Sequence, residues 1–230
     1  MKLQDLFSLK GKVAIVTGGG RGIGRFIATG LAEAGADIVI TSRKMKNLEA
    51  AAEEISKEYG VVNNAGATWG APTLEFPLEK WDYLFNVNVR GVWIMAQKVA
   101  TIMKEQGGGN IINISSVMGL RGSDEMAHPA IPYNSTKAAV NLLTMNLAVK
   151  LAPHNIRVNA IAPGFFGTDM MAYIEQPEFK EAYEATLNVI PMHRLGRIDD
   201  MKGVAAFLAS DASAFMTGHI LINDGGQLAK

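Results

Sequence analysis

The feature that most constrains the fold is a glycine-rich loop between an apolar run and a helical pattern. Residues 13–17 read Val-Ala-Ile-Val-Thr, a short apolar run typical of a buried strand. The loop at 18–24 follows directly, and residues 25–34 show a helical pattern that Gly35 would close as a C-cap. Residues 37–41 form a second apolar run. This order predicts a β-α-β unit in a parallel sheet covered by helices on both faces.

The glycine loop is suited to binding a dinucleotide. Glycines lack Cβ atoms, so the backbone can approach a pyrophosphate, and the free N–H groups at the start of a helix favour its negative charge. The loop fits Gly-x-x-x-Gly-x-Gly and not the common Gly-x-Gly-x-x-Gly. Its position between strand and helix favours dinucleotide binding over a purely structural glycine turn. The predicted cofactor contacts in the loop are Gly18, Gly20, Arg21, Gly22, Ile23 and Gly24.

The residues at the end of the second predicted strand indicate which dinucleotide binds. NAD sites generally place an acidic residue there to bind the ribose hydroxyls, whereas an arginine nearby accommodates a 2′-phosphate. This chain has Thr41-Ser42-Arg43-Lys44 at that point, with Arg21 as a second cation. The sequence therefore favours NADP(H) over NAD(H), with Ser42 and Arg43 as further contacts. The alternative is that Arg43 and Lys44 are solvated loop charges.

Composition excludes several classes of protein. The chain has 230 residues, of which 48% are hydrophobic and 19% charged, so it can bury a core. Its 22 Lys and Arg balance 22 Asp and Glu, which gives no field that favours nucleic acid or a membrane surface. It shows no membrane-spanning run, no signal-peptide pattern, no cysteine and no metal-ligand spacing among its four histidines. A cytoplasmic protein without a metal site is expected.

A tyrosine and a lysine four residues apart begin a helical pattern over residues 133–151. Positions i and i+4 lie on one helix face, so Tyr133 and Lys137 can address the same point. A nearby cation favours the phenolate, and a tyrosine tuned in this way can exchange a proton with a hydroxyl or a carbonyl. The pair is common by chance, and a surface lysine beside a half-buried tyrosine is the plain alternative.

Seven motifs, in their order along nearly the whole chain, resemble those of the short-chain dehydrogenase/reductase family. They are Thr17-Gly18-x-x-x-Gly22-Ile23-Gly24, Asn63-Asn64-Ala65-Gly66, Asn88 in Asn-Val-Arg-Gly, Ser116 in Ser-Val-Met-Gly, Tyr133-x-x-x-Lys137, Pro163-Gly164 with Thr168, and Asp224-Gly225-Gly226. The resemblance implies an α/β fold with a doubly wound, Rossmann-like parallel sheet. It also implies a single domain over residues 1–230, with a substrate lid at about 165–195.

The resemblance implies a role for each matching residue. Tyr133 would be the general acid in carbonyl reduction and the base in alcohol oxidation. Lys137 would lower the pKa of Tyr133 and hold the nicotinamide ribose. Ser116 would hydrogen-bond the substrate oxygen, and Asn88 would anchor a water in a proton relay. Further cofactor contacts would be Asn64, Ala65 and Gly66 on the adenosine side, Thr168 at the nicotinamide carboxamide, and Pro163 and Gly164.

Some of these assignments have alternatives nearby in the sequence. Ser115 is a rival to Ser116, although the Val-Met-Gly context favours Ser116. Asn86 is a rival to Asn88, although Asn88 has the expected place two residues before an Arg-Gly pair. His128, in the loop before the tyrosine, is a further candidate for touching the substrate.

The chain departs from the family pattern before the Asn-Asn-Ala-Gly motif. A second helix is predicted at 47–58, and only residues 59–62 separate it from Asn63. Roughly 30 residues of the family pattern, the size of a strand-helix-strand unit, have no counterpart in this chain near Gly60–Val61. In the family these residues hold a third strand, the helix after it and an Asp that meets the adenine. Either the sequence omits a segment of the protein, which is the favoured explanation, or the protein has a real deletion and an altered sheet edge.

These features predict an NADP(H)-dependent oxidoreductase that interconverts a ketone and a secondary alcohol. Sugar acids or polyols, as for gluconate 5-dehydrogenase-like members, compete with 3-oxoacyl thioesters as the substrate class. The turn at 67–72 and the loop at 122–132 favour the former, and no dense basic patch for an acyl-carrier partner is evident. A catalytically silent dinucleotide-binding regulatory protein is the alternative of another class. The resemblance further implies a homotetramer with subunit contacts through helices at 81–103 and 133–151.

Overall fold

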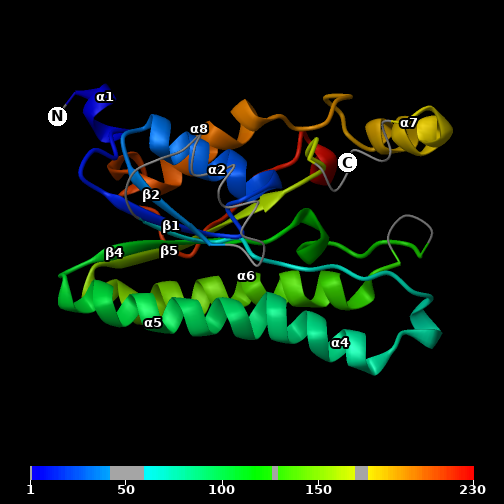
Figure 1. Cartoon of the computed structure of the whole chain (residues 1–230), viewed down its shortest axis with the longest axis horizontal. Coiled ribbons are helices and arrows are strands. Elements are labelled where there is room, and N and C mark those ends of the chain that lie inside the picture. The colour runs from blue at the N-terminus through cyan, green and yellow to red at the C-terminus, as the bar shows by residue number, and fades with distance from the viewer. Residues whose placement is uncertain (1, 42–59, 126–128, 169–175) are drawn as a thin grey trace. The chain divides into compact units, whose positions relative to one another are not determined.

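A computed structural model describes residues 2–41, 60–125, 129–168 and 176–230 (Figure 1). The chain divides into two compact units. The first comprises Met1–Asn64, Pro163–Ala214 and Ile222–Lys230, and the second comprises Ala65–Ala162 and Phe215–Leu221. Four predictions lie outside the described residues, namely the helix at 47–58 and the roles of Ser42, Arg43 and His128.

The first unit is built on three parallel strands. The central strand β1 (Val13–Thr17) lies between β2 (Asp37–Thr41) and β3 (Gly60–Asn63). The bounds predicted for the first two strands are confirmed. Val16 of β1 is fully buried, as its apolar run predicts. Among the described residues of this unit β2 pairs on one side only, which agrees with the predicted lack of a third strand before Asn63.

Two helices of the first unit pack on each other above β1 and β2 in Figure 1. They are α2 (Gly22–Glu33) and α8 (Ile198–Ala209). A Cβ at Gly30 of α2 would lie 2.7 Å from the Cα of Lys202, so a glycine is required for this close approach. The predicted helix at 25–34 begins three residues earlier in the structure. The predicted cap is confirmed, because Gly35 has a φ of +99° just after the helix.

The remaining elements of the first unit are short. They are α1 (Leu3–Leu6), the 3-10 turn η6 (Pro177–Phe179), α7 (Lys180–Asn188), η7 (Asp211–Ser213) and η8 (Gln227–Ala229). The strand β6 (Ile220–Asn223) contributes residues to both units.

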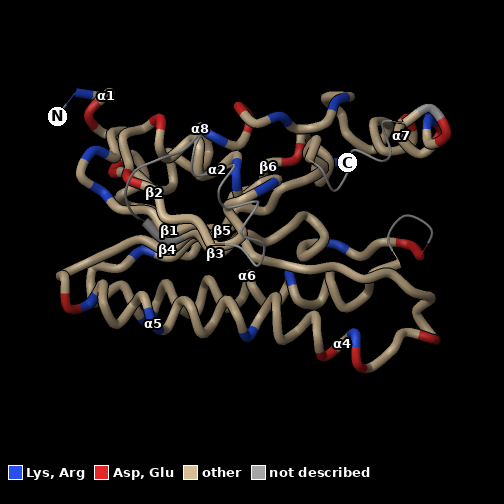
Figure 2. The backbone as a smooth tube through the Cα atoms, in the orientation of Figure 1, with Lys and Arg blue, Asp and Glu red and all other residues tan. Residues whose placement is uncertain are grey.

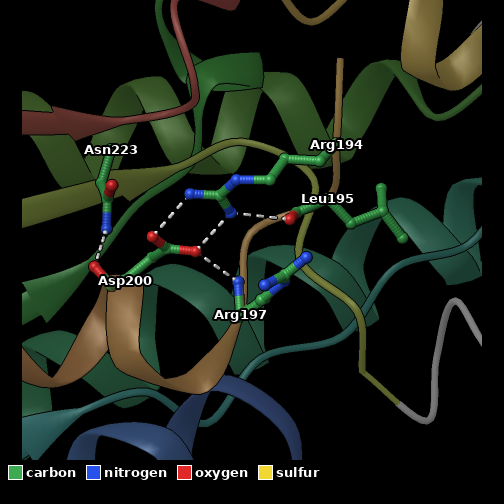
Figure 3. A network of polar contacts seen from close by, with 5 residues as sticks. All are labelled: Arg194, Leu195, Arg197, Asp200 and Asn223. Atoms are coloured by element: carbon green, nitrogen blue, oxygen red, sulfur yellow. Dashed lines mark hydrogen bonds and ion pairs between the residues drawn. The ribbon is translucent and has the colours of Figure 1, made fainter. Parts of the chain in front are cut away.

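An ion pair joins the segment after α7 to the first turn of α8 (Figure 3). Arg194 donates two hydrogen bonds to the Asp200 carboxylate, at 2.6 and 2.9 Å, and one to the carbonyl of Leu195 at 3.1 Å. Asp200 also accepts the backbone N–H of Arg197 at 2.7 Å, and its own carbonyl accepts from Asn223 at 2.9 Å. The Arg194 hydrogen bonds lower the pKa of Asp200 to about 2. The carboxylate therefore anchors this segment to the start of the helix.

The second unit packs helices on a pair of parallel strands, β4 (Gly109–Ile114) and β5 (Ile156–Pro163), which align from Gly109 with Ile156 to Ile114 with Ile161. Its helices are α4 (Leu78–Phe85), α5 (Gly91–Glu105) and α6 (Ile131–Leu151), with 3-10 turns η1 (Thr73–Glu75), η3 (Val117–Gly119) and η4 (Ala152–His154). A π-helical turn, η2 (Asn86–Arg90), joins α4 to α5. The helix predicted at 81–103 is thus one continuous helical stretch with a π turn inside it.

Buried polar side chains connect the layers of the second unit. Asn113 of β4 is fully buried and donates a hydrogen bond to the hydroxyl of Thr144 on α6 at 2.9 Å. The Thr144 hydroxyl in turn donates to the carbonyl of Val140 at 2.8 Å. Because an unpaired amide in this position would be destabilising, the network fixes α6 on the strand.

We expect Asp200→Asn to lower the urea midpoint of unfolding at neutral pH, because a neutral amide cannot form the charged pair with Arg194. The folded pKa of about 2 lies below the ordinary value. The stabilisation is therefore full above about pH 4 and is lost as the pH falls toward the folded pKa.

Unfolding measured at neutral pH and near pH 3 should show the difference between wild type and variant shrinking with acid. Asp199→Asn is the matched control, since its exposed carboxylate contacts Lys202 at 3.4 Å. Equal effects of the two substitutions at neutral pH would contradict the role given to Asp200.

Candidate active site

Two adjacent serines follow the carboxyl end of β4, and their hydroxyl groups make different contacts. The Ser115 hydroxyl donates to the main-chain carbonyl of Lys137 at 3.1 Å, which ties the strand end to α6. The Ser116 hydroxyl accepts the N–H of Met118 at 3.2 Å and is hydrogen-bonded to the side chain of Tyr133. This geometry supports the choice of Ser116 over Ser115 as the serine that faces a substrate.

The turn that carries Ser116 lies very close to α6 because it ends in a glycine. A Cβ at Gly119 would lie 2.6 Å from the carbonyl carbon of Lys137 and 2.8 Å from the nitrogen of Ala138. The Gly119 carbonyl also accepts a hydrogen bond from Asn141 of α6 at 3.1 Å. A larger residue would push the turn, and Ser116 with it, away from the helix.

The helix α6 carries Tyr133 and Lys137 one turn apart. Lys137 is buried, with 6% of its surface exposed, and its ammonium donates to the carbonyl of Ile114 at 2.8 Å. The same nitrogen lies 5.5 Å from the centre of the Tyr133 ring. The cation is therefore held by the last residue of β4 and placed beside the tyrosine.

Burial shifts the pKa of both groups toward their neutral forms. It raises the pKa of Tyr133, an effect that the hydrogen bond with Ser116 partly offsets. It lowers the pKa of Lys137 to about 8. The pKa of Tyr133 is therefore shifted in the opposite direction to the lowering by Lys137 that the sequence led us to expect, because the loss of solvent around the hydroxyl outweighs the hydrogen bond with Ser116. Tyr133 therefore keeps its proton at neutral pH.

Asn88 in the π turn connects the segment at Ala67 to α6. Its side chain is buried, accepts the N–H of Ala67 at 2.8 Å and donates to the carbonyl of Ala67 at 2.9 Å. It also donates to the hydroxyl of Thr136 at 3.0 Å, and Thr136 donates to the carbonyl of Tyr133 at 2.7 Å. Asn86 is exposed, which supports Asn88 in the choice between them.

These bonds use both N–H donors of the Asn88 side chain. They hold the chain at Ala67 and the start of α6 in one position. The role of Asn88 in a water relay stays a prediction. Thr136, fully buried, is a positioning residue that sequence reasoning missed.

The glycine loop of the first unit leads from β1 into α2. Gly18 and Gly22 have φ angles of +68° and +54°, a conformation that favours glycine. A Cβ at Gly24 would collide with the side-chain nitrogen of Asn64 and with the carbonyl of Gly18. Asn64 donates from that nitrogen to the carbonyls of Thr17 and Gly18, at 3.1 and 3.3 Å. Asn64, which follows β3, thus ties the glycine loop to the end of β1.

Other predicted cofactor residues of the first unit lie beside this loop. The Cβ of Thr168 is 3.6 Å from the place where a Cβ of Gly22 would lie. A Cβ at Gly164, in the turn after Pro163, would lie 2.8 Å from the Cβ of Asp224, so the turn needs a glycine there. Arg21 at the helix start is exposed. The contacts of these residues with a dinucleotide stay predictions.

The remaining predicted contacts are distributed over both units. Gly20 and Ile23 are half-buried in the glycine loop and the first turn of α2. Ala65 and Gly66 are exposed residues of the second unit.

The structure also bears on membranes, metals and charge. None of the helices among the described residues is long and apolar enough to cross a membrane. Within the same residues, no group of three or more His, Cys, Asp or Glu side chains could hold a metal ion. Figure 2 shows positive and negative residues interspersed along the described chain.

Two family models match the sequence. One, described as enoyl-(acyl carrier protein) reductase, matches residues 49–227. The other, described as short chain dehydrogenase, matches residues 12–61. The two matches meet between residues 49 and 61, where the motif pattern is interrupted.

Similar proteins extend over nearly the whole chain. A 5-keto-D-gluconate 5-reductase of Escherichia coli strain K12 is 37% identical, with 98% of this chain and 99% of that protein covered. A 3-oxoacyl-[acyl-carrier-protein] reductase of Aquifex aeolicus is 36% identical, with 95% and 98% covered. The crystal structure of a gluconate 5-dehydrogenase from Burkholderia cenocepacia, in complex with NADP and tartrate, is 34% identical with a TM-score of 0.86 and full coverage of both chains. This similarity confirms the Rossmann-like fold.

The alignments also confirm that this chain lacks residues that the family pattern contains. The alignment with the E. coli protein runs over 258 positions, whereas this chain has 230 residues. At least 28 positions, 258 less 230, therefore lack a counterpart in this chain.

We expect Gly119→Ala to destabilise the fold by about 1–3 kcal/mol, the usual effect of overpacking, because its methyl group would meet the backbone of α6. Gly122→Ala is the matched control, since a Cβ there has no atom within 4 Å. Urea unfolding of both variants measures the difference. A Gly119→Ala variant as stable as the control would show that the turn does not depend on this contact.

Proposed function

This chain belongs to the short-chain dehydrogenase/reductase family of oxidoreductases, and we propose that it uses NADP(H) to interconvert a ketone and a secondary alcohol of a sugar acid or polyol. The observation that carries the chemistry is the arrangement at the end of β4. The Tyr133 hydroxyl is hydrogen-bonded to Ser116, and the buried ammonium of Lys137 lies beside its ring.

The side chains of this group supply the proton chemistry. Ser116 and Tyr133 bind the substrate oxygen through their hydroxyls. Burial keeps the proton on Tyr133, so the hydroxyl donates it to the carbonyl oxygen during reduction and recovers it during oxidation. The nearby Lys137 cation stabilises the phenolate that forms. NADP(H), when bound, supplies or accepts the hydride.

The cofactor proposal rests on the glycine loop and on arginines. The pyrophosphate lies at the N-terminus of α2, where backbone N–H groups and the helix dipole favour an anion. Arg21, with Ser42 and Arg43, binds the 2′-phosphate that distinguishes NADP(H) from NAD(H). NADP in the structure of the Burkholderia relative supports this choice.

The substrate class rests on the relatives. The E. coli relative is named for a keto-gluconate, and the Burkholderia relative is a gluconate dehydrogenase. A 3-oxoacyl thioester is the second candidate, which the similar reductase of Aquifex aeolicus favours. A silent dinucleotide-binding protein is disfavoured by the presence of Ser116, Tyr133 and Lys137 in one arrangement.

We further propose a cytoplasmic homotetramer of single-domain subunits, each with a substrate lid at about 165–195. Its support is a set of exposed apolar side chains on α4, α5 and α6, the helices predicted for subunit contacts. They are Tyr83, Trp93, Ile94, Ile102, Leu142, Met145 and Val149.

A substrate screen that follows NADPH absorbance tests the proposed function. Sugar acids, polyols and 3-oxoacyl thioesters are compared side by side in both directions. Turnover of a keto sugar acid or polyol is the expected result. Turnover of the thioesters alone would favour the second candidate.

We expect Tyr133→Phe to lower turnover by about 10²–10⁴, the contribution of a general acid or base, and to leave NADPH binding nearly unchanged. Tyr83→Phe is a control, since this exposed tyrosine lies on α4 and outside both the proposed lid and the catalytic group. Turnover by the Tyr133 variant at the wild-type rate would rule out the proposed proton donor.

A further inference from the structure

The turn that carries Ser116 is too short to set its own position. It is the 3-10 turn η3, which begins directly after Ser116 and ends at Gly119. The Ser116 hydroxyl accepts the N–H of Met118 at 3.2 Å, and its carbonyl accepts the N–H of Gly119 at 3.0 Å. The chain that follows, residues 120–125, is exposed. A 3-10 segment of one turn has few hydrogen bonds of its own, so the position of the Ser116 hydroxyl depends on what the turn contacts.

The helix α6 contacts both ends of this turn. Tyr133, Lys137 and Asn141 follow one another at intervals of four residues, which places them on one side of the helix. At the start of the turn, Ser116 is hydrogen-bonded to the side chain of Tyr133. At its end, the side-chain nitrogen of Asn141 donates to the carbonyl of Gly119 at 3.1 Å. All of these residues belong to the second unit, and the turn is held at two points of a single helix.

The amide of Asn141 is buried, and only one of its two polar atoms is paired. The residue has 6% of its surface exposed. Because the carbonyl of Gly119 can only accept, the atom that faces it must be the amide nitrogen. The Oδ1 atom of Asn141 then meets no hydrogen-bond donor in the part of the chain that the structure describes. A buried polar atom without a partner is destabilising, so stability alone favours an apolar side chain here. The contact with Gly119 is what the asparagine supplies and an apolar side chain cannot.

We propose that Asn141 is a positioning residue for the proposed reaction. Its hydrogen bond holds the end of η3 against α6, and this keeps the Ser116 hydroxyl beside the Tyr133 hydroxyl and the substrate oxygen that both bind. Asn141 acts through Ser116 and touches neither substrate nor cofactor. A misplacement of about 1 Å can lower a rate by about 10²-fold. The inference rests on the proposed function, which gives Ser116 and Tyr133 the substrate oxygen.

The first test is Asn141→Leu, which removes the donor and keeps a branched side chain. We expect kcat for the substrate found in the screen to fall by about tenfold to 10²-fold, with the KM for NADPH within about twofold of wild type. The urea midpoint of unfolding should stay near that of wild type, because the variant also removes the unpaired Oδ1 atom. Turnover at the wild-type rate would overturn the inference.

The second test is Asn141→Asp, which keeps the shape of the side chain and makes its donor depend on pH. A protonated carboxyl can donate to the carbonyl of Gly119, whereas a carboxylate only accepts and repels it. Burial raises the pKa of such a carboxyl, so the protonated form persists to a higher pH than usual. The ratio of variant to wild-type kcat should therefore fall as the pH rises from about 6 to about 9.

Asn146→Asp is the matched control for the pH test. Asn146 lies on the same helix but is exposed, and its side chain donates only to the carbonyl of Leu142 within α6, at 3.0 Å. Its ratio to wild type should stay near one over the whole range. A ratio near one at every pH for Asn141→Asp as well would overturn the inference.

Hydrogen exchange gives a readout that does not depend on turnover. Mass spectrometry of a peptide that covers residues 115–121 reports how often the N–H groups of Met118 and Gly119 lose their hydrogen bonds. Exchange in this peptide should be about tenfold faster in Asn141→Leu than in wild type, because the turn loses one of its two points of attachment. Equal exchange in the two proteins would overturn the inference.

The outcomes separate this inference from the proposed function. If wild type turns over none of the substrates in the screen, the proposed function fails, and the exchange comparison still decides whether Asn141 holds the turn. If wild type is active and both Asn141 variants match it, the inference fails while the proposed function stands.

Discussion

The candidate active site depends on one buried cation. An ammonium away from water is strongly unfavourable unless hydrogen bonds replace its solvent. Lys137 meets this requirement through the carbonyl of Ile114 at the end of β4, and its pKa still falls to about 8. This hydrogen bond therefore fixes the position of α6 along β4. The Ser115 hydroxyl and the bare backbone of Gly119 allow that close approach.

The position of Tyr133 follows from the same anchoring. Thr136 bonds the carbonyl of Tyr133, and Asn88 bonds both Thr136 and the backbone of Ala67. The π turn brings Asn88 inward while Asn86 stays exposed, so an irregular helix serves a polar network. A network with its donors satisfied holds reacting groups in place before a substrate arrives, which lowers the entropic part of a barrier.

Much of this arrangement could be predicted from the sequence. The strands at 13–17 and 37–41 are apolar runs bounded by turn residues, and the structure gives them the same bounds. The start of α2 was missed by three residues because Gly22 to Gly24 suggest a loop, although the helix begins at Gly22. The short interval before Asn63 revealed the lack of a third strand, because a parallel crossover needs a minimum length.

Burial and contact were harder to predict. Nothing in the pattern marks Thr136, because a threonine within an apolar helix has no periodic signal of its own. Spacing suggested that Lys137 would lower the pKa of Tyr133, but the direction depends on how deeply the hydroxyl lies. Such effects arise from the packing of distant segments and require the fold.

Burial of Lys137 lowers the pKa of its ammonium to about 8, and the account depends on this shift. Its titration can be followed by NMR in a protein with labelled lysine side chains, with Lys137→Met to assign the resonance. The account predicts that this lysine titrates near pH 8, well below the other lysines. A pKa at the ordinary value of about 10.4 would contradict it.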